Sequence, residues 1–286
     1  MISILIPCYN YDVIELIQTL HKQINIIKKK FEIICVEDGS TNTFLNINIK
    51  KLTHVKYIQL NKNIGRSKIR NFLAKEAKFN WLLFIDCDSK IENNNFLANY
   101  IKCTSTQNIV TYGETVYQDK KPKKEKTLHW KYGKKIETKK KKNIFSSHHF
   151  LIYKQAFEKI KFNEDIKYYG HEDTIFWIDL KNENYKFKFI KNPLTHIGLE
   201  TNEIFIKKTK DALINLYLLN KKYDLNSISI IKTQKKISRF LSAELILYIF
   251  NLTKKHILKN LVSSNPSIIL FQFYKLGCYF ELIKDD

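Results

Sequence analysis

The chain has 286 residues, which is enough for one large domain or for one domain with an appendage. It carries 49 basic and 28 acidic residues, and its formal net charge of +21 predicts attraction to nucleic acid, anionic lipid or phosphorylated substrates. No stretch of about 18 uncharged apolar residues occurs, so a transmembrane helix is not expected.

The five cysteines and the first residues of the chain both bear on its location. The cysteines show no C-x-x-C pair and no metal-ligand spacing, which fits a reducing compartment. Residues 1–7 enter a predicted strand directly, without a basic segment or a cleavage site, so no signal peptide is expected. We therefore expect a cytoplasmic protein.

Short apolar runs alternate with helical segments over the first 117 residues. Apolar runs of five or six residues bounded by polar residues are typical of buried strands, whereas apolar positions three and four apart indicate helices. The predicted strands are 2–6, 32–36, 55–60, 81–85 and 109–117. The predicted helices are 11–28, 41–50, 65–78 and 95–104. This alternation predicts βαβ units and a largely parallel sheet.

The second half of the chain changes character twice. For the lysine-dense stretch 120–142, either a solvated loop or exposed helix or a mobile flap over an acidic ligand fits the pattern. Further strands are predicted at 145–152 and 185–190, with helices at 154–160 and 172–184, and the helices 212–223, 237–250 and 267–283 follow. We place a boundary at residue 200, between an α/β domain at 1–200 and a C-terminal helical extension at 201–286.

Two carboxylates follow the most apolar of the predicted strands, 81–85. Asp86 and Asp88 are separated by one residue, so in an extended segment both side chains can face one site. Ligands gather at the carboxyl ends of parallel strands, and two hard oxygen ligands suit Mg²⁺ or Mn²⁺ with a phosphate completing the shell. A solvated strand-to-turn junction is the alternative for so short a motif.

The ends of the first three predicted strands carry further candidates. Pro7 is expected to end the first strand, and Tyr9 could stack on a base or pack as a loop aromatic. Asp38 could accept a hydrogen bond from a base or simply form a turn. Residues 63–66 begin a helix, where backbone N–H groups are expected to be free for a phosphate or a base edge.

Arginine is rare in this chain, which contains only Arg66, Arg70 and Arg239. Arg66 and Arg70 are four residues apart and share a face of the predicted helix. Their retention among many lysines suggests a need for a planar, forked donor. Later, Glu172 and Asp173 open a helix, where first-turn acids are also common for purely structural reasons.

Taken together, these motifs resemble the family 2 glycosyltransferases of GT-A fold. The motifs are I-P-C-Y-N at 6–10, E-D-G-S at 37–40, N-I-G-R-S-K-I-R-N at 63–71, D-C-D at 86–88 and G-H-E-D at 170–173. They match in order and spacing over roughly residues 1–200. The resemblance implies a GT-A-like, Rossmann-type nucleotide-binding catalytic domain with a mostly parallel sheet, followed by a helical region. It implies inverting transfer from a nucleotide sugar, most often a UDP-sugar, to a hydroxyl of a glycan or lipid-linked acceptor.

The resemblance also implies roles for individual residues. The donor nucleotide pocket would be lined by Pro7, Tyr9, Asn10, Asp38, Gly65, Arg66, Arg70 and Asp86. Mn²⁺ or Mg²⁺ would be held by Asp86, Asp88 and His196, although a structural role for His196 is also open. Asp173 would be the general base with Glu172 beside it. The acceptor-proximal candidates are His148, His149 and His171.

Residues 233–283 mix apolar stripes with lysines. Amphipathic basic helices are typical of membrane-surface elements, so an anionic membrane is a candidate partner at the inner face of the cell membrane. A helical cap on the catalytic domain or a dimer surface explains the same stripes.

Two other functions are alternatives to glycosyl transfer. A sugar nucleotidyltransferase would need a glycine-rich basic loop after the first strand, and P-C-Y-N-Y is not one. Nucleic-acid binding has only the net charge in its favour, because no recognised motif accompanies it, so no nucleic-acid partner is expected.

Overall fold

The computed structural model describes residues 1–27, 29–42, 45–138, 145–166 and 168–284. The chain forms two compact units. The first comprises Met1–Gln118, Ile136–Asp165 and Glu172–Gly198, and the second comprises Asp119–Lys135, Ile166–His171 and Leu199–Asp286. The assignment of a catalytic domain to 1–200 and of an extension to 201–286 stays a prediction, and two earlier segments belong with the later helices.

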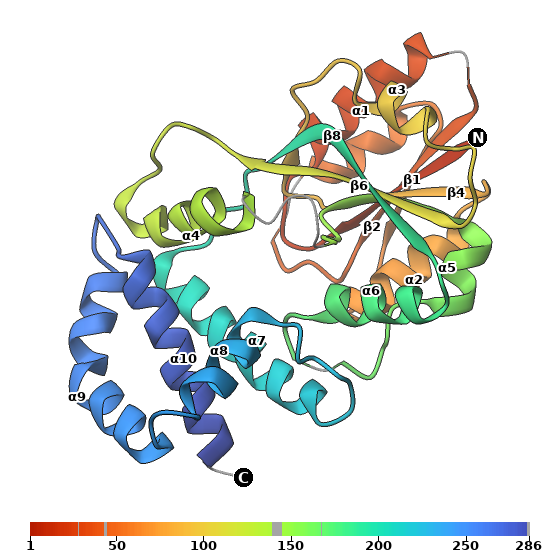
Figure 1. Cartoon of the computed structure of the whole chain (residues 1–286). Coiled ribbons are helices and arrows are strands. Elements are labelled where there is room, and N and C mark those ends of the chain that lie inside the picture. The colour runs from red at the N-terminus through yellow and green to blue at the C-terminus, as the bar shows by residue number, and fades with distance from the viewer. Residues whose placement is uncertain (28, 43–44, 139–144, 167, 285–286) are drawn as a thin grey trace. The chain divides into compact units, whose positions relative to one another are not determined.

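An eight-stranded sheet forms the centre of the first unit (Figure 1). Its strands are β1 Ile2–Cys8, β2 Phe31–Glu37, β3 Val55–Gln59, β4 Trp81–Ile85, β5 Ser89–Lys90, β6 Ile109–Tyr117, β7 His149–Tyr153 and β8 Lys186–His196. They lie in the order β3-β2-β1-β4-β7-β6-β8-β5. The pairs β1/β2, β1/β4, β2/β3 and β6/β8 are parallel, whereas β4/β7, β6/β7 and β5/β8 are antiparallel. The predicted α/β class with a mostly parallel sheet is confirmed.

Helices cover both faces of this sheet. The helical elements of the unit are α1 Ile14–Ile26, η1 Leu45–Lys51, α2 Arg66–Glu76, α3 Phe96–Ile101, α5 Lys154–Ile160 and α6 Glu172–Asn182. Figure 1 shows α1 and α3 on one side of the sheet and α2, α5 and α6 on the other. The central strands are therefore buried on both faces, which explains why they are continuous apolar runs.

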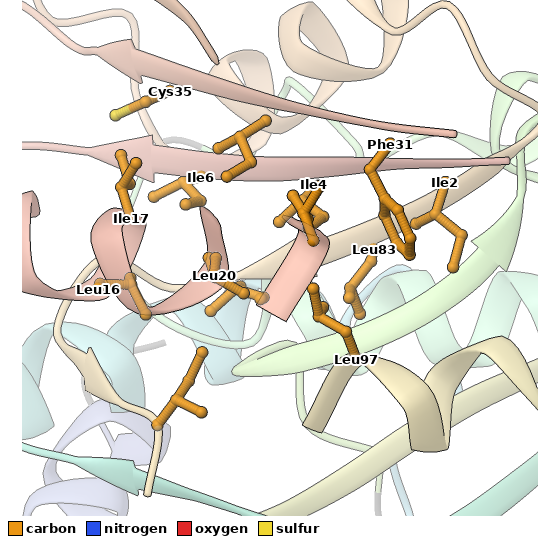
Figure 2. Close-up of a cluster of buried hydrophobic side chains, with 14 of the residues drawn as sticks. Ile2, Ile4, Ile6, Leu16, Ile17, Leu20, Phe31, Cys35, Leu83 and Leu97 are labelled. Atoms are coloured by element: carbon orange, nitrogen blue, oxygen red, sulfur yellow. The ribbon is translucent and has the colours of Figure 1, made fainter. Parts of the chain in front are cut away.

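Alternation along β1 divides the core into two layers. Ile4 packs with Ile33 and Leu83 in the layer under α1, and the next residue, Leu5, packs with the opposite layer under α2. In Figure 2 the side chains of Ile4 and Ile6 lie between the sheet and the Leu16, Ile17 and Leu20 side of α1, and Ile2 lies beside Phe31. The opposite layer is rich in phenylalanine, and Phe162 and Phe176 stack there with ring centroids 4.2 Å apart.

The last strand is longer than the sequence predicts. The sequence predicts a strand at 185–190, but β8 continues to His196 because residues 193–196 pair with β6 on one side and, at their end, with β5 on the other. Pro193 lies opposite Glu114, where the β6/β8 register shifts, and such an irregularity tolerates a residue without an N–H. His196 is thus held at the end of a strand rather than in a free loop.

The second unit is helical. Its elements are η2 Lys124–Lys126, α4 Thr127–Tyr132, α7 Asn202–Asn220, α8 Ser229–Ile237, α9 Ala243–Leu261 and α10 Ile268–Lys284, and the turn η3 Gly133–Glu137 follows α4. The predicted helix 237–250 is wrong in its bounds, because Ser242 caps a new helix by accepting a hydrogen bond from Leu245 N (3.3 Å). Across the described ranges, no helix combines the length and the apolarity needed to cross a bilayer.

The lysine-dense stretch begins as a mostly exposed loop at residues 120–123 and then becomes helical, with one side of the helix buried. In α4, Leu128 is fully buried and its backbone N–H donates to Asn202 Oδ1 (2.9 Å). The His129 ring stacks on Phe205 with centroids 4.3 Å apart. The apolar side of α4 thus anchors the segment within the second unit, while residues 139–144 lie outside the described ranges.

Replacing Leu83 by alanine tests the central layer. Leu83 is fully buried, so Leu83→Ala should lower the free energy of unfolding by about 2–5 kcal/mol in urea denaturation. Ile26 at the end of α1 is 82% exposed, so Ile26→Ala should change it by less than about 0.5 kcal/mol. Similar losses for the two variants would contradict the assigned core.

Candidate active site

The acid loop, residues 86–88, follows β4 and is shaped by hydrogen bonds to its backbone. Asp86 N donates to His148 O (2.9 Å), and Ser89 Oγ donates to Asp86 O (2.6 Å). Ile197 N donates to Asp88 O (2.9 Å), which ties the loop to the end of β8. Both carboxylates are thereby fixed at the carboxyl end of the strand, where the sequence predicts a site.

Arg70 of α2 neutralises the first carboxylate. Its Nη2 atom lies 2.7 Å from Asp86 Oδ1, and its side chain is 5% exposed. The guanidinium also lies over the ring of Phe162, 5.4 Å from the centroid, and donates to Arg66 O (3.3 Å). Burial raises the pKa of Asp86, and the charge of Arg70 opposes that shift.

His196 contacts the second carboxylate. Its Nε2 atom lies 3.1 Å from Asp88 Oδ2, because Ser89 of β5 pairs with His196 of β8. Burial alone would raise the pKa of Asp88, but the hydrogen bond and the charge of His196 bring it below its ordinary value. The same contact outweighs burial at the imidazole and raises the pKa of His196.

Gly198 leaves room for the Asp88 carboxylate. A Cβ atom at position 198 would lie 2.2 Å from Asp88 Oδ2 and 2.7 Å from Asp88 Cγ. Any side chain there would displace the carboxylate from His196. None of the sequence motifs includes Gly198, and its place two residues after His196 is the local signal that points to it.

Glu172 and Asp173 open α6, and Glu172 Oε1 lies 3.4 Å from Arg66 Nη1. Burial, followed by the negative charge of Glu172, raises the pKa of Asp173 to about 6. Arg70 and Asp86 also act on Asp173 electrostatically, which indicates that the start of α6 lies in the field of the acid loop. The structure thus brings the predicted base, the arginine pair and the acid loop together within the first unit.

Asp38 fastens two loops together. Its Oδ1 accepts from Ile64 N (2.7 Å) and its Oδ2 from Gly65 N (3.1 Å). The expectation that these two N–H groups are free for a ligand is therefore wrong, because the Asp38 carboxylate already accepts from both of them just before α2 begins. Burial raises the pKa of Asp38 although both N–H groups favour its charged form. A contact between Asp38 and a nucleoside stays a prediction.

The loop after β1 is clamped in a similar way. Asn10 Oδ1 accepts from Thr41 N (2.8 Å) and Asn42 N (2.9 Å), so this side chain holds the loop after β2. Tyr9 is 48% exposed and its ring is available for stacking. β1 continues through Pro7 to Cys8, since the fixed φ of proline is compatible with an extended backbone.

His148 and His149 are buried and form hydrogen bonds with neighbouring strands and helices. His148 Nε2 lies 3.0 Å from Ser89 Oγ and its Nδ1 lies 3.0 Å from Thr115 Oγ1. His149 Nδ1 lies 2.7 Å from the Tyr100 hydroxyl. Burial lowers the pKa of His148 well below its usual value and that of His149 to about 4.

Both imidazoles are at most 5% exposed, so we do not propose direct contact with an acceptor for either of them. The hydrogen bonds of Ser89 and Thr115 to His148 could not be predicted, because they join strands that are distant in sequence. His171, the third acceptor-proximal candidate, belongs to the second unit, where it adopts a positive φ of 68°.

Comparison with known proteins decides the family. Residues 3–161, more than half of the chain, match Glycosyl transferase family 2. The chain belongs to this family. The predicted resemblance is thereby confirmed, and the family match favours a glycosyltransferase over a nucleotidyltransferase or a nucleic-acid-binding protein.

Three similar proteins accompany the family match. The poly(ribitol-phosphate) beta-glucosyltransferase of Bacillus spizizenii is 35% identical over 119 residues, which cover 40% of this chain and 19% of that protein. The crystal structure of S. aureus TarS 1–349 in complex with UDP matches with a TM-score of 0.52 and 19% identity, covering 99% of this chain and 90% of that one. The mannosyltransferase PcManGT of Pyrobaculum calidifontis, in complex with GDP-Man and Mn²⁺, has a TM-score of 0.58 and 11% identity, covering 99% and 86%. The matched segment thus spans about a fifth of the curated relative, and the structural likenesses show the fold alone.

The acid loop offers few protein ligands to a divalent cation. Over the described ranges, no group of three or more His, Cys, Asp or Glu side chains is arranged to hold a metal ion. Asp88 Oδ2 and His196 Nε2 nevertheless form an adjacent oxygen and nitrogen pair, whereas Asp86 Oδ1 is occupied by Arg70. Carboxylate and imidazole suit Mn²⁺, and Mg²⁺ sites often have only one or two carboxylates, completed by substrate phosphates.

Replacing Arg70 tests how much its ion pair with Asp86 contributes to the free energy of unfolding. Arg70→Met leaves the Asp86 carboxylate without its cation, so the free energy of unfolding should fall by about 3 kcal/mol in urea denaturation. The exposed pair Lys159 and Glu183 is a control, and Lys159→Met should cost less than about 1 kcal/mol. Equal losses would show that the Arg70 pair contributes no more than a surface ion pair.

Proposed function

We propose that this chain transfers a sugar from a UDP-sugar to a hydroxyl of a glycan or lipid-linked acceptor. In the proposal the anomeric configuration inverts, Asp173 is the general base, and Mn²⁺ or Mg²⁺ is the cofactor. The observation that carries the proposal is one juxtaposition. Glu172, next to Asp173 at the start of α6, lies 3.4 Å from Arg66, and Arg70 on the same helix as Arg66 lies 2.7 Å from Asp86 of the acid loop, in a chain of family 2.

The donor side of the proposal is supported by the acid loop and its surroundings. Arg70 fixes the orientation of Asp86, whose remaining oxygen would accept hydrogen bonds from the ribose. Asp88 and His196 would hold the divalent cation, which when bound would neutralise charge on the leaving diphosphate. Tyr9 would stack on the base. UDP is favoured as the nucleotide because TarS 1–349, which shares this fold, was crystallised with UDP.

On the acceptor side, Asp173 would take the proton from the attacking hydroxyl. The oxygen forms its bond to the anomeric carbon from the face opposite the diphosphate, which leaves with the electron pair of the broken bond. A base works best when its pKa lies close to the working pH, and burial together with Glu172 brings the pKa of Asp173 to about 6. Asp173 is therefore more basic than an ordinary aspartate and is still ionised at neutral pH.

The net positive charge of the chain favours an acceptor that carries negative charge. The Bacillus relative is named for poly(ribitol-phosphate), a polyanion, and the net charge of +21 suits an acceptor that carries phosphate groups. We extend this preference to the present chain, which would then glycosylate a phosphate-bearing or lipid-linked glycan.

Substitution of Asp173 tests the proposal directly. UDP release from a panel of UDP-sugars, measured with Mn²⁺ and a ribitol phosphate oligomer, should fall about 10²- to 10⁴-fold in kcat for Asp173→Asn. Affinity for UDP should be unchanged. Wild-type kcat should drop tenfold per pH unit below about pH 6, because Asp173 is then protonated.

Two variants on the same helix are controls. Glu172→Gln removes the neighbouring negative charge, so it should lower the pKa of Asp173 and move the acid limb of the pH profile to lower pH. Asp179→Asn, further along α6, should leave both kcat and the profile unchanged. An active Asp173→Asn enzyme with the wild-type profile would exclude Asp173 as the base.

A further inference from the structure

One face of α9 exposes a row of large apolar side chains. The row, here called the α9 stripe, includes two residues that precede the helix. Its members are Phe240, Leu241, Leu245, Tyr248, Ile249 and Leu252. Their exposed fractions run from 43% for Ile249 to 79% for Phe240. The four helical members follow the i, i+3, i+4, i+7 spacing, so they form one continuous surface.

The core of the second unit does not use this stripe. The opposite face of α9 is buried, and Ile246 and Leu247 pack there with Leu276 and Phe280 of α10. Phe250 fills the space above Gly277, where a Cβ atom would lie 2.3 Å from its ring. α9 therefore has two apolar faces, and only one of them is needed to hold the unit together. Contiguous exposed apolar surface of this kind marks an interaction site.

Lysine and arginine side chains lie at both ends of the α9 stripe. Between residues 229 and 261 the sequence contains six lysines and one arginine but only one acidic residue, Glu244. Lys236 and Arg239 are exposed just before Phe240, and Lys255 and Lys259 are exposed beyond Leu252. Lys254 is the exception, because it pairs with Glu281 of α10 (2.7 Å).

This arrangement favours one kind of occupant. An apolar row flanked by lysine and arginine suits the surface of an anionic bilayer, where apolar side chains enter the acyl boundary and cations meet phosphate groups. A second copy of the chain docking stripe to stripe would bring the same cations together at a two-fold interface, and like charges there are unfavourable.

We propose that the α9 stripe docks this protein on an anionic phospholipid bilayer. The stripe contains none of the residues assigned to the active site, so the proposal does not depend on the chemistry of transfer. It would place the enzyme at the surface where lipid-linked acceptors are found.

Vesicle flotation tests the proposal with the full chain. The wild-type protein should float with phosphatidylcholine–phosphatidylglycerol vesicles at low salt, should not float with phosphatidylcholine alone, and should be released as salt rises. The triple variant Leu245→Ser, Ile249→Ser, Leu252→Ser should bind at least about tenfold more weakly. Lys236→Ala with Arg239→Ala should weaken binding about 30-fold, since each cation near the surface contributes about 1 kcal/mol.

A matched control uses exposed apolar residues of α7 in the same unit. Ile204 and Leu218 are 44% and 41% exposed, so Ile204→Ser with Leu218→Ser should float like the wild type. Thermal unfolding and circular dichroism of every variant should match the wild type, because the replaced side chains are exposed. Absence of wild-type flotation with anionic vesicles, or equal flotation of the stripe variant, would overturn the proposal. So would a dimer that depends on the stripe and binds no lipid.

Discussion

The site depends on two carboxylates, Asp86 and Asp88, that lie one residue apart. Each has its own positively charged or hydrogen-bonding partner, which offsets the repulsion between them. Asp86 is matched by the buried guanidinium of Arg70, and Asp88 by the imidazole of His196. Burial by itself would raise the pKa of each acid and neutralise it. The two partners approach from different elements, α2 and β8, so the charge of the loop is a property of the tertiary structure rather than of the D-C-D motif.

The surrounding polar groups mostly hold loops rather than offer free ligands. Asp38 binds the backbone of the loop before α2, and Asn10 binds the loop after β2. Buried Glu37 accepts from the Tyr57 hydroxyl (2.7 Å) and from Asn46 Nδ2 (3.1 Å). Such a network fixes the carboxyl ends of β1, β2 and β3, so a nucleotide would meet a rigid rim. Preorganisation of this kind reduces the ordering that binding would otherwise require.

The features that depend on neighbouring residues in the sequence could be predicted from the sequence. The apolar runs of β1 to β4 and the motif residues of the acid loop and of α2 were found from spacing alone. The end of β8 was missed because residues 193–196 become strand only by pairing with β5 and β6. The role of Gly198 depends on its closeness to Asp88, which lies more than a hundred residues earlier. The family match ends at residue 161, so Asp173 and His196, for which the resemblance implies roles, lie outside the matched segment.

A crystal structure with UDP and Mn²⁺, with the cation located by anomalous scattering, tests the central claim most directly. The account predicts one Mn²⁺ ion coordinated by Asp88 and His196, a diphosphate on that ion, and the uracil ring against Tyr9. An ion bound elsewhere, or a nucleotide that does not contact the acid loop, would contradict it.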